Sequence, residues 1–348
     1  MRERELNSQC GFSCRESDRI AMSLKALHGR GCIDCAGRWF GPDGICWRWC
    51  RFYQGRSTIL RDVCAAILRR VPFPGRSRVV SSIHSFFGPM AGFTTVPLYG
   101  GGKLLIDVER STEMYYTGCL DWNVQHYLLS NCAAGAVVLD IGASIGEYTV
   151  PLAHHVGPSG HVYAFEVLPV KFQLLEKNIR LNQLANVTPI HCALGQHSGE
   201  LAVPFRDELV NYSLASKADR TMTVPAMSLD EFIEKYDLSS VALISMDAEG
   251  SEGAILKGGY RTLQRRKVRA LCCEINPVLL ELLDSSAAEV YALLKSAGYR
   301  IHKLTRLGNT RHLRGDEYGR LTNWARSNGE KFEIVATSSG PVQFADVP

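Results

Sequence analysis

Residues 137–150 read VVLDIGASIGEYTV, and they carry the strongest structural signal in this chain. Residues 137–141 form a short apolar run, which is typical of a strand buried on both faces of a parallel sheet. A glycine-containing turn follows, and a helix is predicted over 146–155. Gly142 permits a tight turn, Gly146 lets the helix pack closely, and backbone N–H groups at the helix start can face a ligand. The stretch therefore predicts a strand, a turn and a helix with a ligand site at the turn.

The same alternation of strands and helices continues to the end of the chain. Further apolar runs predict strands at 161–166, 187–191, 241–247, 268–274, 300–304 and 332–337. Helical spacing separates several of them, most clearly over 286–297, where Ser286 and Glu289 have the spacing of a capping box. This order predicts an α/β fold with a doubly wound, mostly parallel sheet and helices on both faces.

The sequence pattern divides the chain into three parts. Residues 135–348 carry the α/β domain, residues 57–134 form a small N-terminal extension, and residues 1–56 form a cysteine-rich leader without a sustained period. The extension is predicted to contain a helix at 58–70, a hairpin around the glycines at 100–102 and a helix at 113–131. Seven of the 12 cysteines lie in the first 64 residues, so the leader is either poorly ordered or a zinc site built from close cysteine pairs.

Composition excludes several classes of protein. No run of 18 apolar residues occurs, which argues against a membrane-spanning helix. No apolar stretch follows the N-terminal Met1, so we expect a cytoplasmic protein with reduced cysteines. The formal net charge of +4 is too small to predict binding to nucleic acid or to an anionic membrane surface.

Two residues near the first turn indicate which ligand binds there. Glu166 ends the second strand, 24 residues after Gly142, where a carboxylate can accept hydrogen bonds from both ribose hydroxyls. Ser144 stands where a dinucleotide-binding turn has a glycine that lets a pyrophosphate approach. A side chain at that position, together with the negative charge of Asp140, favours the cationic, phosphate-free S-adenosylmethionine over a nicotinamide dinucleotide.

Six segments together resemble the FkbM family of methyltransferases. They are VVLDIGASIGEYTV, VYAFEVLP, NVTPIHCALG, VPAMSLDEF, LISMDAEGSEGAILKGG and ALCCEI, in this order along the chain. The resemblance covers about half of the chain. It implies a class I methyltransferase fold with a seven-stranded sheet whose last strand is antiparallel. It also implies S-adenosylmethionine as donor and O-methylation of a hydroxyl on a small-molecule or glycan acceptor.

The resemblance assigns cofactor contacts residue by residue. Asp140, Gly142 and Gly146 would line the methionine part of the cofactor, beside Ser144. Glu166 would hold the ribose, and the segment Cys192, Ala193 and Leu194 would flank the adenine. The chain departs from the family at four positions, where Ser144, Val167, Gln196 and Ser245 replace the usual Asn, Pro, Asp and Lys.

The family's acidic motif supplies the candidate catalytic residues. Asp247, Glu249 and Glu252 match it, and Asp247 or Glu249 is predicted to be the base that takes the proton of an acceptor hydroxyl. Alternatively, Asp247 positions the cofactor, and Glu249 and Glu252 face a helix dipole. A magnesium site using Asp247, Glu249 and Glu274 is a further alternative, although we expect no metal. The loss of the lysine at 245 leaves a non-catalytic binding protein as an alternative function, and a nicotinamide-dependent oxidoreductase is another.

Overall fold

The computed structural model describes residues 32–33, 39–40, 47–70, 76–87, 90, 92–205 and 220–338. The chain forms two compact units, residues 1–63 and residues 64–348. The first unit contains the paired strands β1 (Cys32–Ile33) and β2 (Trp39–Phe40) and the greater part of α2 (Trp47–Arg70). The possible zinc site of the leader lies outside the described side chains.

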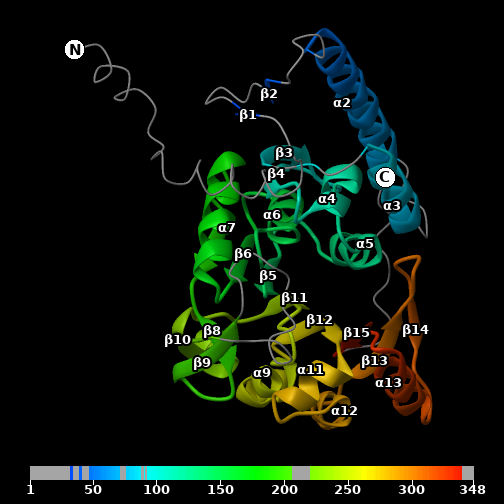
Figure 1. The fold of residues 1–348 in the computed structure, drawn as a ribbon. Coiled ribbons are helices and arrows are strands. Elements are labelled where there is room, and N and C mark those ends of the chain that lie inside the picture. Colours follow the sequence, from blue (N-terminus) through cyan, green and yellow to red (C-terminus); the bar gives the residue numbers. More distant parts are fainter. Residues whose placement is uncertain are drawn as a thin grey trace. The chain divides into compact units, whose positions relative to one another are not determined.

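The second unit is built on an eight-stranded sheet with the order β14-β13-β15-β12-β11-β5-β6-β7 (Figure 1). Its strands are β5 (Val137–Ile141), β6 (His161–Phe165), β7 (Val187–Ile190), β11 (Val241–Met246), β12 (Val268–Ile275), β13 (Arg300–Leu304), β14 (Thr310–His312) and β15 (Phe332–Thr337). Neighbours from β7 to β12 are parallel, and β15 is antiparallel to β12 and to β13. The seven predicted strands are present with the last one antiparallel. The short, exposed β14 adds an edge strand that no apolar run indicated.

Two layers of helices cover this sheet. Figure 1 shows α6 (Thr149–Val156) and α7 (Pro169–Leu181) on the side opposite α9 (Glu252–Gly258), α11 (Pro277–Leu282) and α12 (Ala287–Ser296). The remaining helices of this part are α8 (Leu229–Lys235), α10 (Tyr260–Gln264) and α13 (Glu317–Asn328). The capping prediction for α12 is confirmed in its first half, because the Ser286 hydroxyl accepts a hydrogen bond from the N–H of Glu289.

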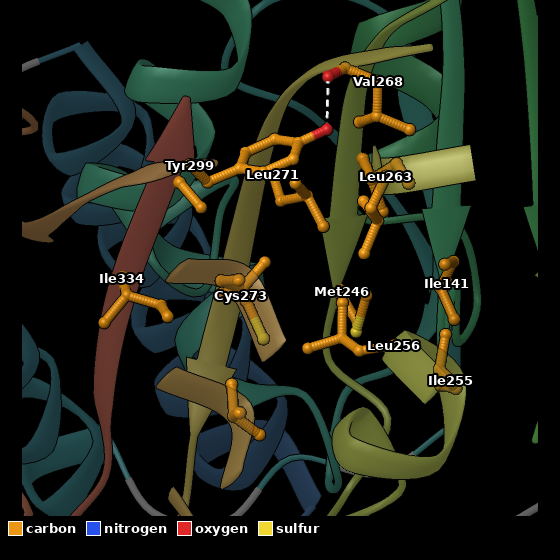
Figure 2. Packing of buried hydrophobic residues seen from close by; sticks show 14 of the residues in the cluster. Ile141, Met246, Ile255, Leu256, Leu263, Val268, Leu271, Cys273, Tyr299 and Ile334 are labelled. Carbon is orange, nitrogen blue, oxygen red and sulfur yellow. Dashed lines mark hydrogen bonds between the residues drawn. The ribbon is translucent and has the colours of Figure 1, made fainter. Parts of the chain in front are cut away.

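Successive strand residues alternate between two apolar cores. Leu139, Ile244 and Leu271 face one core, whereas their neighbours Val138, Leu243 and Ala270 face the other. Figure 2 shows the first core, where Met246 lies beside Leu256 of α9 and Ile141 lies beside Ile255 of the same helix. There the hydroxyl of Tyr299 donates a hydrogen bond of 2.6 Å to the carbonyl of Val268. Burial on both sides explains why the central strands are continuously apolar.

The N-terminal extension differs from prediction in its helices. Before the sheet come α3 (Arg76–Phe87), the hairpin β3 (Phe93–Pro97) and β4 (Lys103–Asp107), α4 (Thr112–Thr117) and α5 (Trp122–Ser130). Helix α2 begins at Trp47 rather than at 58, because the apolar period that predicted it starts only near Ile59. The helix predicted over 113–131 is two helices, since Gly118 adopts φ +69° and ends α4. The hairpin itself is confirmed.

A buried side chain of α7 anchors the hairpin to the turn that follows β5. Asn178 of α7 is fully buried, and its Oδ1 accepts a 2.7 Å hydrogen bond from the N–H of Leu105 in β4. Its Nδ2 donates a 2.8 Å bond to the carbonyl of Ile145. One side chain thus joins the extension, α7 and the turn after β5.

A smaller sheet lies beyond β7. It consists of β8 (Ala193–Gly195), β9 (Gly199–Phe205) and β10 (Arg220–Ser228), in the order β8-β10-β9. Among the described helices, none is both long and apolar enough to cross a bilayer.

Candidate active site

A cavity of about 360 Å³ opens at the carboxyl ends of β5, β6 and β11. Strands β5 and β11 are neighbours in the register Asp140 to Ser245, so the sheet order reverses here, which is where doubly wound folds bind ligands. Eight predicted site residues line the cavity: Gly142, Ser144, Glu166, Cys192, Ala193, Leu194, Asp247 and Glu249. Asp140 and Gly146 are not in its wall.

The turn after β5 is held tightly against two neighbouring strands. The N–H groups of Gly142 and Ala143 donate hydrogen bonds of 3.0 and 2.8 Å to the carbonyl of Phe165. Gly142 has φ +83°, and a Cβ there would overlap the carbonyl oxygen of Asp247 and lie 2.9 Å from its carbonyl carbon. Only glycine adopts this φ without strain and leaves room for the carbonyl group of Asp247. The close approach brings the acidic turn after β11 against the glycine turn.

Ser144 occupies an unusual backbone conformation for its residue type. Its φ is +51°, in the left-handed region where asparagine is several-fold enriched among residues other than glycine. The preference of the family for Asn at this position therefore has a backbone reason.

Glu166 supports the turn as well as facing the cavity. Its Oε2 accepts a 2.9 Å hydrogen bond from the N–H of Ser144, and its Oε1 accepts one of 2.7 Å from the N–H of Leu168. Burial raises the pKa of Glu166, while the charge of Lys171 and the backbone donors act in the opposite direction. A carboxylate has about four lone-pair sites, so Glu166 can still accept hydrogen bonds from ribose hydroxyls.

Asp140 lies beneath the cavity, contrary to the expectation that it lines it. It is 1% exposed, and its Oδ2 accepts a 2.6 Å hydrogen bond from the hydroxyl of Thr149, the first residue of α6. Burial raises the pKa of Asp140 to about 7, against the lowering effect of hydrogen bonds from Thr149 and Ser245. The strand pleat directs this side chain towards α6 and away from the cavity. Gly146 likewise packs against Leu175 of α7.

The acidic turn after β11 is shaped by Glu252. Glu252 is buried, and its Oε1 accepts hydrogen bonds from the N–H groups of Ala248, at 2.9 Å, and Gly250, at 3.3 Å. Burial raises its pKa to about 7, helped by the charge of Asp247. Glu249 precedes the helix and has φ +50°, so it does not belong to the first turn of α9. Glu252 therefore caps the turn and positions Asp247 and Glu249.

Asp247 and Glu249 face the cavity in different ways. The Oδ1 atom of Asp247 is buried, and none of the described residues donates a hydrogen bond to it. Burial raises the pKa of Asp247, and the nearby charge of Lys331 opposes that effect. Burial and the charge of Asp247 raise the pKa of Glu249 to about 7. The cavity thus contains one buried carboxylate oxygen open to a donor and a second acid that titrates near neutrality.

Residues 140–301 match the methyltransferase FkbM domain. This segment is an FkbM methyltransferase domain. Methyltransferase 1 of Beauveria bassiana is 26% identical over 188 residues, which are 47% of this chain and 72% of that protein. The hexuronic acid methyltransferase AglP of Haloferax volcanii is 27% identical over 142 residues, which are 41% of this chain and 57% of AglP.

Solved structures that match this chain include two proteins with a bound cofactor. TYW2 of M. jannaschii in complex with AdoMet is 17% identical, with a TM-score of 0.34, covering 72% of this chain and 86% of TYW2. Aeropyrum pernix fibrillarin with natively bound S-adenosyl-L-methionine is 15% identical, with a TM-score of 0.34, covering 71% of this chain and all of fibrillarin.

The FkbM domain has Ser245 where the family usually has a lysine, and this serine interacts with a buried acid. Ser245 is 3% exposed, and its hydroxyl lies against the carboxylate of Asp140. Within the described residues, no group of three or more His, Cys, Asp or Glu side chains is arranged to hold a metal ion. Asp247, Glu249 and Glu274, the acids of the magnesium alternative, therefore do not form such a group.

Sequence reasoning missed several charged residues of the FkbM cavity. They are Glu113, Asp121, Glu147, Lys171 and Lys331. Lys171 carried a usable signal, because it falls in the first turn of the helix that follows Glu166. Glu113 and Asp121 come from the extension, and Lys331 directly precedes the last strand. All three lie far from the motifs, so no local spacing indicates them.

Proposed function

We propose that this chain is an S-adenosylmethionine-dependent O-methyltransferase that acts on a hydroxyl of a sugar or small natural product. The observation that carries the proposal is that one cavity joins a glycine turn held by Glu166 to the buried Oδ1 of Asp247, to which none of the described residues donates a hydrogen bond. When bound, the cofactor supplies a methyl group on a positively charged sulfur.

The cavity residues fit such a cofactor. The carboxylate of Glu166 suits the ribose hydroxyls, and the buried segment Cys192, Ala193 and Leu194 offers an apolar wall for the adenine. The side chain of Ser144 stands where a pyrophosphate would need bare backbone, which favours S-adenosylmethionine over NAD. The cavity acids also favour a cationic ligand, since opposite charges attract strongly at low dielectric.

Asp247 is the residue proposed to accept the acceptor's proton. Its Oδ1 has no donor among the described residues, so an acceptor hydroxyl can supply one. Glu249 is the second candidate, because a pKa near 7 suits a base at neutral pH. Enclosure by Tyr148 and Leu168 would orient the hydroxyl and exclude water, which are the main requirements of an in-line transfer.

The first test measures cofactor binding. S-adenosylmethionine or S-adenosylhomocysteine should raise the melting temperature, and NAD should not. At 100 times the dissociation constant, binding adds about 2.7 kcal/mol to the free energy of unfolding. A shift produced by NAD alone would refute the proposal in favour of an oxidoreductase.

The second test measures transfer. Mass spectrometry should detect methylated products from a panel of glycans and hydroxylated small molecules incubated with S-adenosylmethionine. Asp247→Asn should reduce transfer by about 10²–10⁴-fold, the usual contribution of a general base, with cofactor affinity within a few-fold of the parent. Glu249→Gln is the companion variant. If both transfer at the parent rate, neither acid is the base. If cofactor binds but no acceptor reacts, the non-catalytic alternative gains support.

The acceptor class is proposed from two sources. The FkbM resemblance and the name of AglP, a hexuronic acid methyltransferase, support a small-molecule or glycan acceptor. The absence of a nucleic-acid or membrane partner stays a prediction, which rests on the formal net charge of +4. Including an RNA oligonucleotide in the same panel tests the exclusion of nucleic acid.

A further inference from the structure

Lys331 brings a positive charge to the acidic side of the cavity. It precedes β15, lines the cavity together with Asp247, and forms an ion pair with the carboxylate of Glu274 in β12. The side chain of Glu274 is 11% exposed and that of Lys331 is 43% exposed. The lysine therefore reaches from the rim of the cavity towards a nearly buried acid.

The strand register explains how these residues meet. Ser245 of β11 lies opposite Cys272 of β12, and Glu274 lies opposite Glu333 of β15. Side chains two residues apart on a strand share a face of the sheet. Asp247 lies two residues after Ser245, and Glu274 lies two residues after Cys272. Lys331 lies two residues before Glu333 in the antiparallel strand β15. Three adjacent strand ends thus direct them to the same side of the sheet.

The surroundings of Asp247 contain many more acids than bases. Acids that interact electrostatically with it are Asp121, Asp140, Glu249, Glu252, Glu274 and Glu333. The lysines that act on it are Lys331 and Lys171, and Lys331 has the larger effect. Burial would lower the pKa of Lys331, yet the charges of Glu274 and Asp247 raise it above its ordinary value. Lys331 accordingly stays charged.

We propose that Lys331 is a positioning residue that keeps Asp247 ionised at neutral pH, a task that residue 245 cannot perform in this chain because it is a serine bonded to Asp140. This role rests on the proposed function, in which Asp247 takes the acceptor's proton. An ionised carboxylate can accept that proton, whereas a protonated one cannot. Lys331 acts through Asp247 and need not touch the acceptor.

Two neighbours of Asp247 give opposite expectations. The charge of Lys331 lowers the pKa of Asp247. Lys331→Met removes that charge and should raise the pKa of Asp247 by about one unit, the lower end of the usual effect of a nearby opposite charge. Glu274→Gln releases Lys331 from its ion pair, so the whole lysine charge can act on Asp247 and should lower the pKa of Asp247. If the ion pair between Lys331 and Glu274 were only structural, the two variants would not shift the pKa of Asp247 in opposite directions.

The test is a direct titration of Asp247 in the full chain bound to S-adenosylhomocysteine. Carboxyl-¹³C aspartate is incorporated, and the Asp247 resonance is assigned by its loss in Asp247→Asn. The midpoint should rise by about one unit in Lys331→Met, fall in Glu274→Gln and stay near the parent value in Lys331→Arg. Lys295→Met, which removes an exposed charge from α12, is the matched control and should change nothing.

The outcomes separate this inference from the proposed function. An Asp247 midpoint unchanged in Lys331→Met, with the melting temperature preserved, overturns the role of Lys331 whether or not an acceptor is known. With an acceptor from the panel, the acid limb of kcat/KM should move to higher pH in Lys331→Met by the same amount as the midpoint. A limb that stays in place while the midpoint moves overturns the assignment of Asp247 as the base, and the catalytic role of Lys331 with it.

Discussion

Gly142→Ala adds only a methyl group, yet we expect it to be among the most destabilising glycine-to-alanine substitutions in this chain. The glycine has φ +83°, and an added Cβ would overlap the carbonyl oxygen of Asp247 and lie 2.9 Å from its carbonyl carbon. Ordinary contacts between carbon atoms are about 3.5–4.0 Å, so one of the two strand ends must move by roughly 1 Å.

The cost can be built from two contributions. A left-handed conformation costs an alanine about 1–2 kcal/mol. Separating the strand ends also weakens the 3.0 Å hydrogen bonds from the N–H of Asp247 to Ile141 and from the N–H of Gly142 to Phe165. A buried donor left unsatisfied costs about 1–3 kcal/mol. The free energy of unfolding should therefore fall by about 2–5 kcal/mol.

Gly329→Ala is the matched control for the backbone contribution. Gly329 ends α13 with φ +63°, and a Cβ there meets nothing within 4 Å. Its alanine variant should lose only about 1–2 kcal/mol. Urea unfolding followed by circular dichroism gives both values, and calorimetry with S-adenosylhomocysteine should show weaker binding for Gly142→Ala alone. Equal losses of stability in the two variants would refute the close contact between the turns.

Three further predictions concern the cavity and its supports. Glu252 has a pKa raised to about 7 by burial, so its contribution to stability is present at low pH and lost as pH rises from its ordinary value of 4.5. The urea midpoint should fall between pH 5 and 8, and Glu252→Gln should flatten that slope. Glu166→Gln should weaken S-adenosylhomocysteine binding about tenfold or more in calorimetry, because hydrogen bonds to a charged acceptor are worth about 1.5–3 kcal/mol. Deletion of residues 1–46, which precede α2, should leave that binding unchanged, because the cavity is lined by residues between Glu113 and Lys331.

Each of these predictions has its own control. Glu252→Ala should be less stable than Glu252→Gln at every pH, since it leaves the N–H groups of Ala248 and Gly250 without their acceptor. Glu176→Gln changes a partly exposed acid of α7 and should bind cofactor like the parent. An insoluble product of the deletion, or stoichiometric zinc in the intact chain, would show that the leader is structural.

The succession of strands along the chain and the place of the glycine turn could be predicted from the sequence alone. Apolar runs such as residues 137–141 and 241–246 are local patterns. A strand that is buried on both faces needs such a run, so the run predicts the strand. The same holds for Glu166, whose position at the end of the second strand follows from counting residues along the chain. These features needed no knowledge of distant contacts.

Side-chain directions and long-range contacts depend on the three-dimensional fold and could not be predicted from the sequence. The pleat directs Asp140 beneath the turn, although its place in the motif suggested the cavity wall. Glu252 points back into its own turn, because two backbone N–H groups there need an acceptor. Lys331 reaches Glu274 across an antiparallel strand pair that joins residues 57 positions apart. Such pairings depend on strand order and register in space, which the local periodicity of a sequence does not encode.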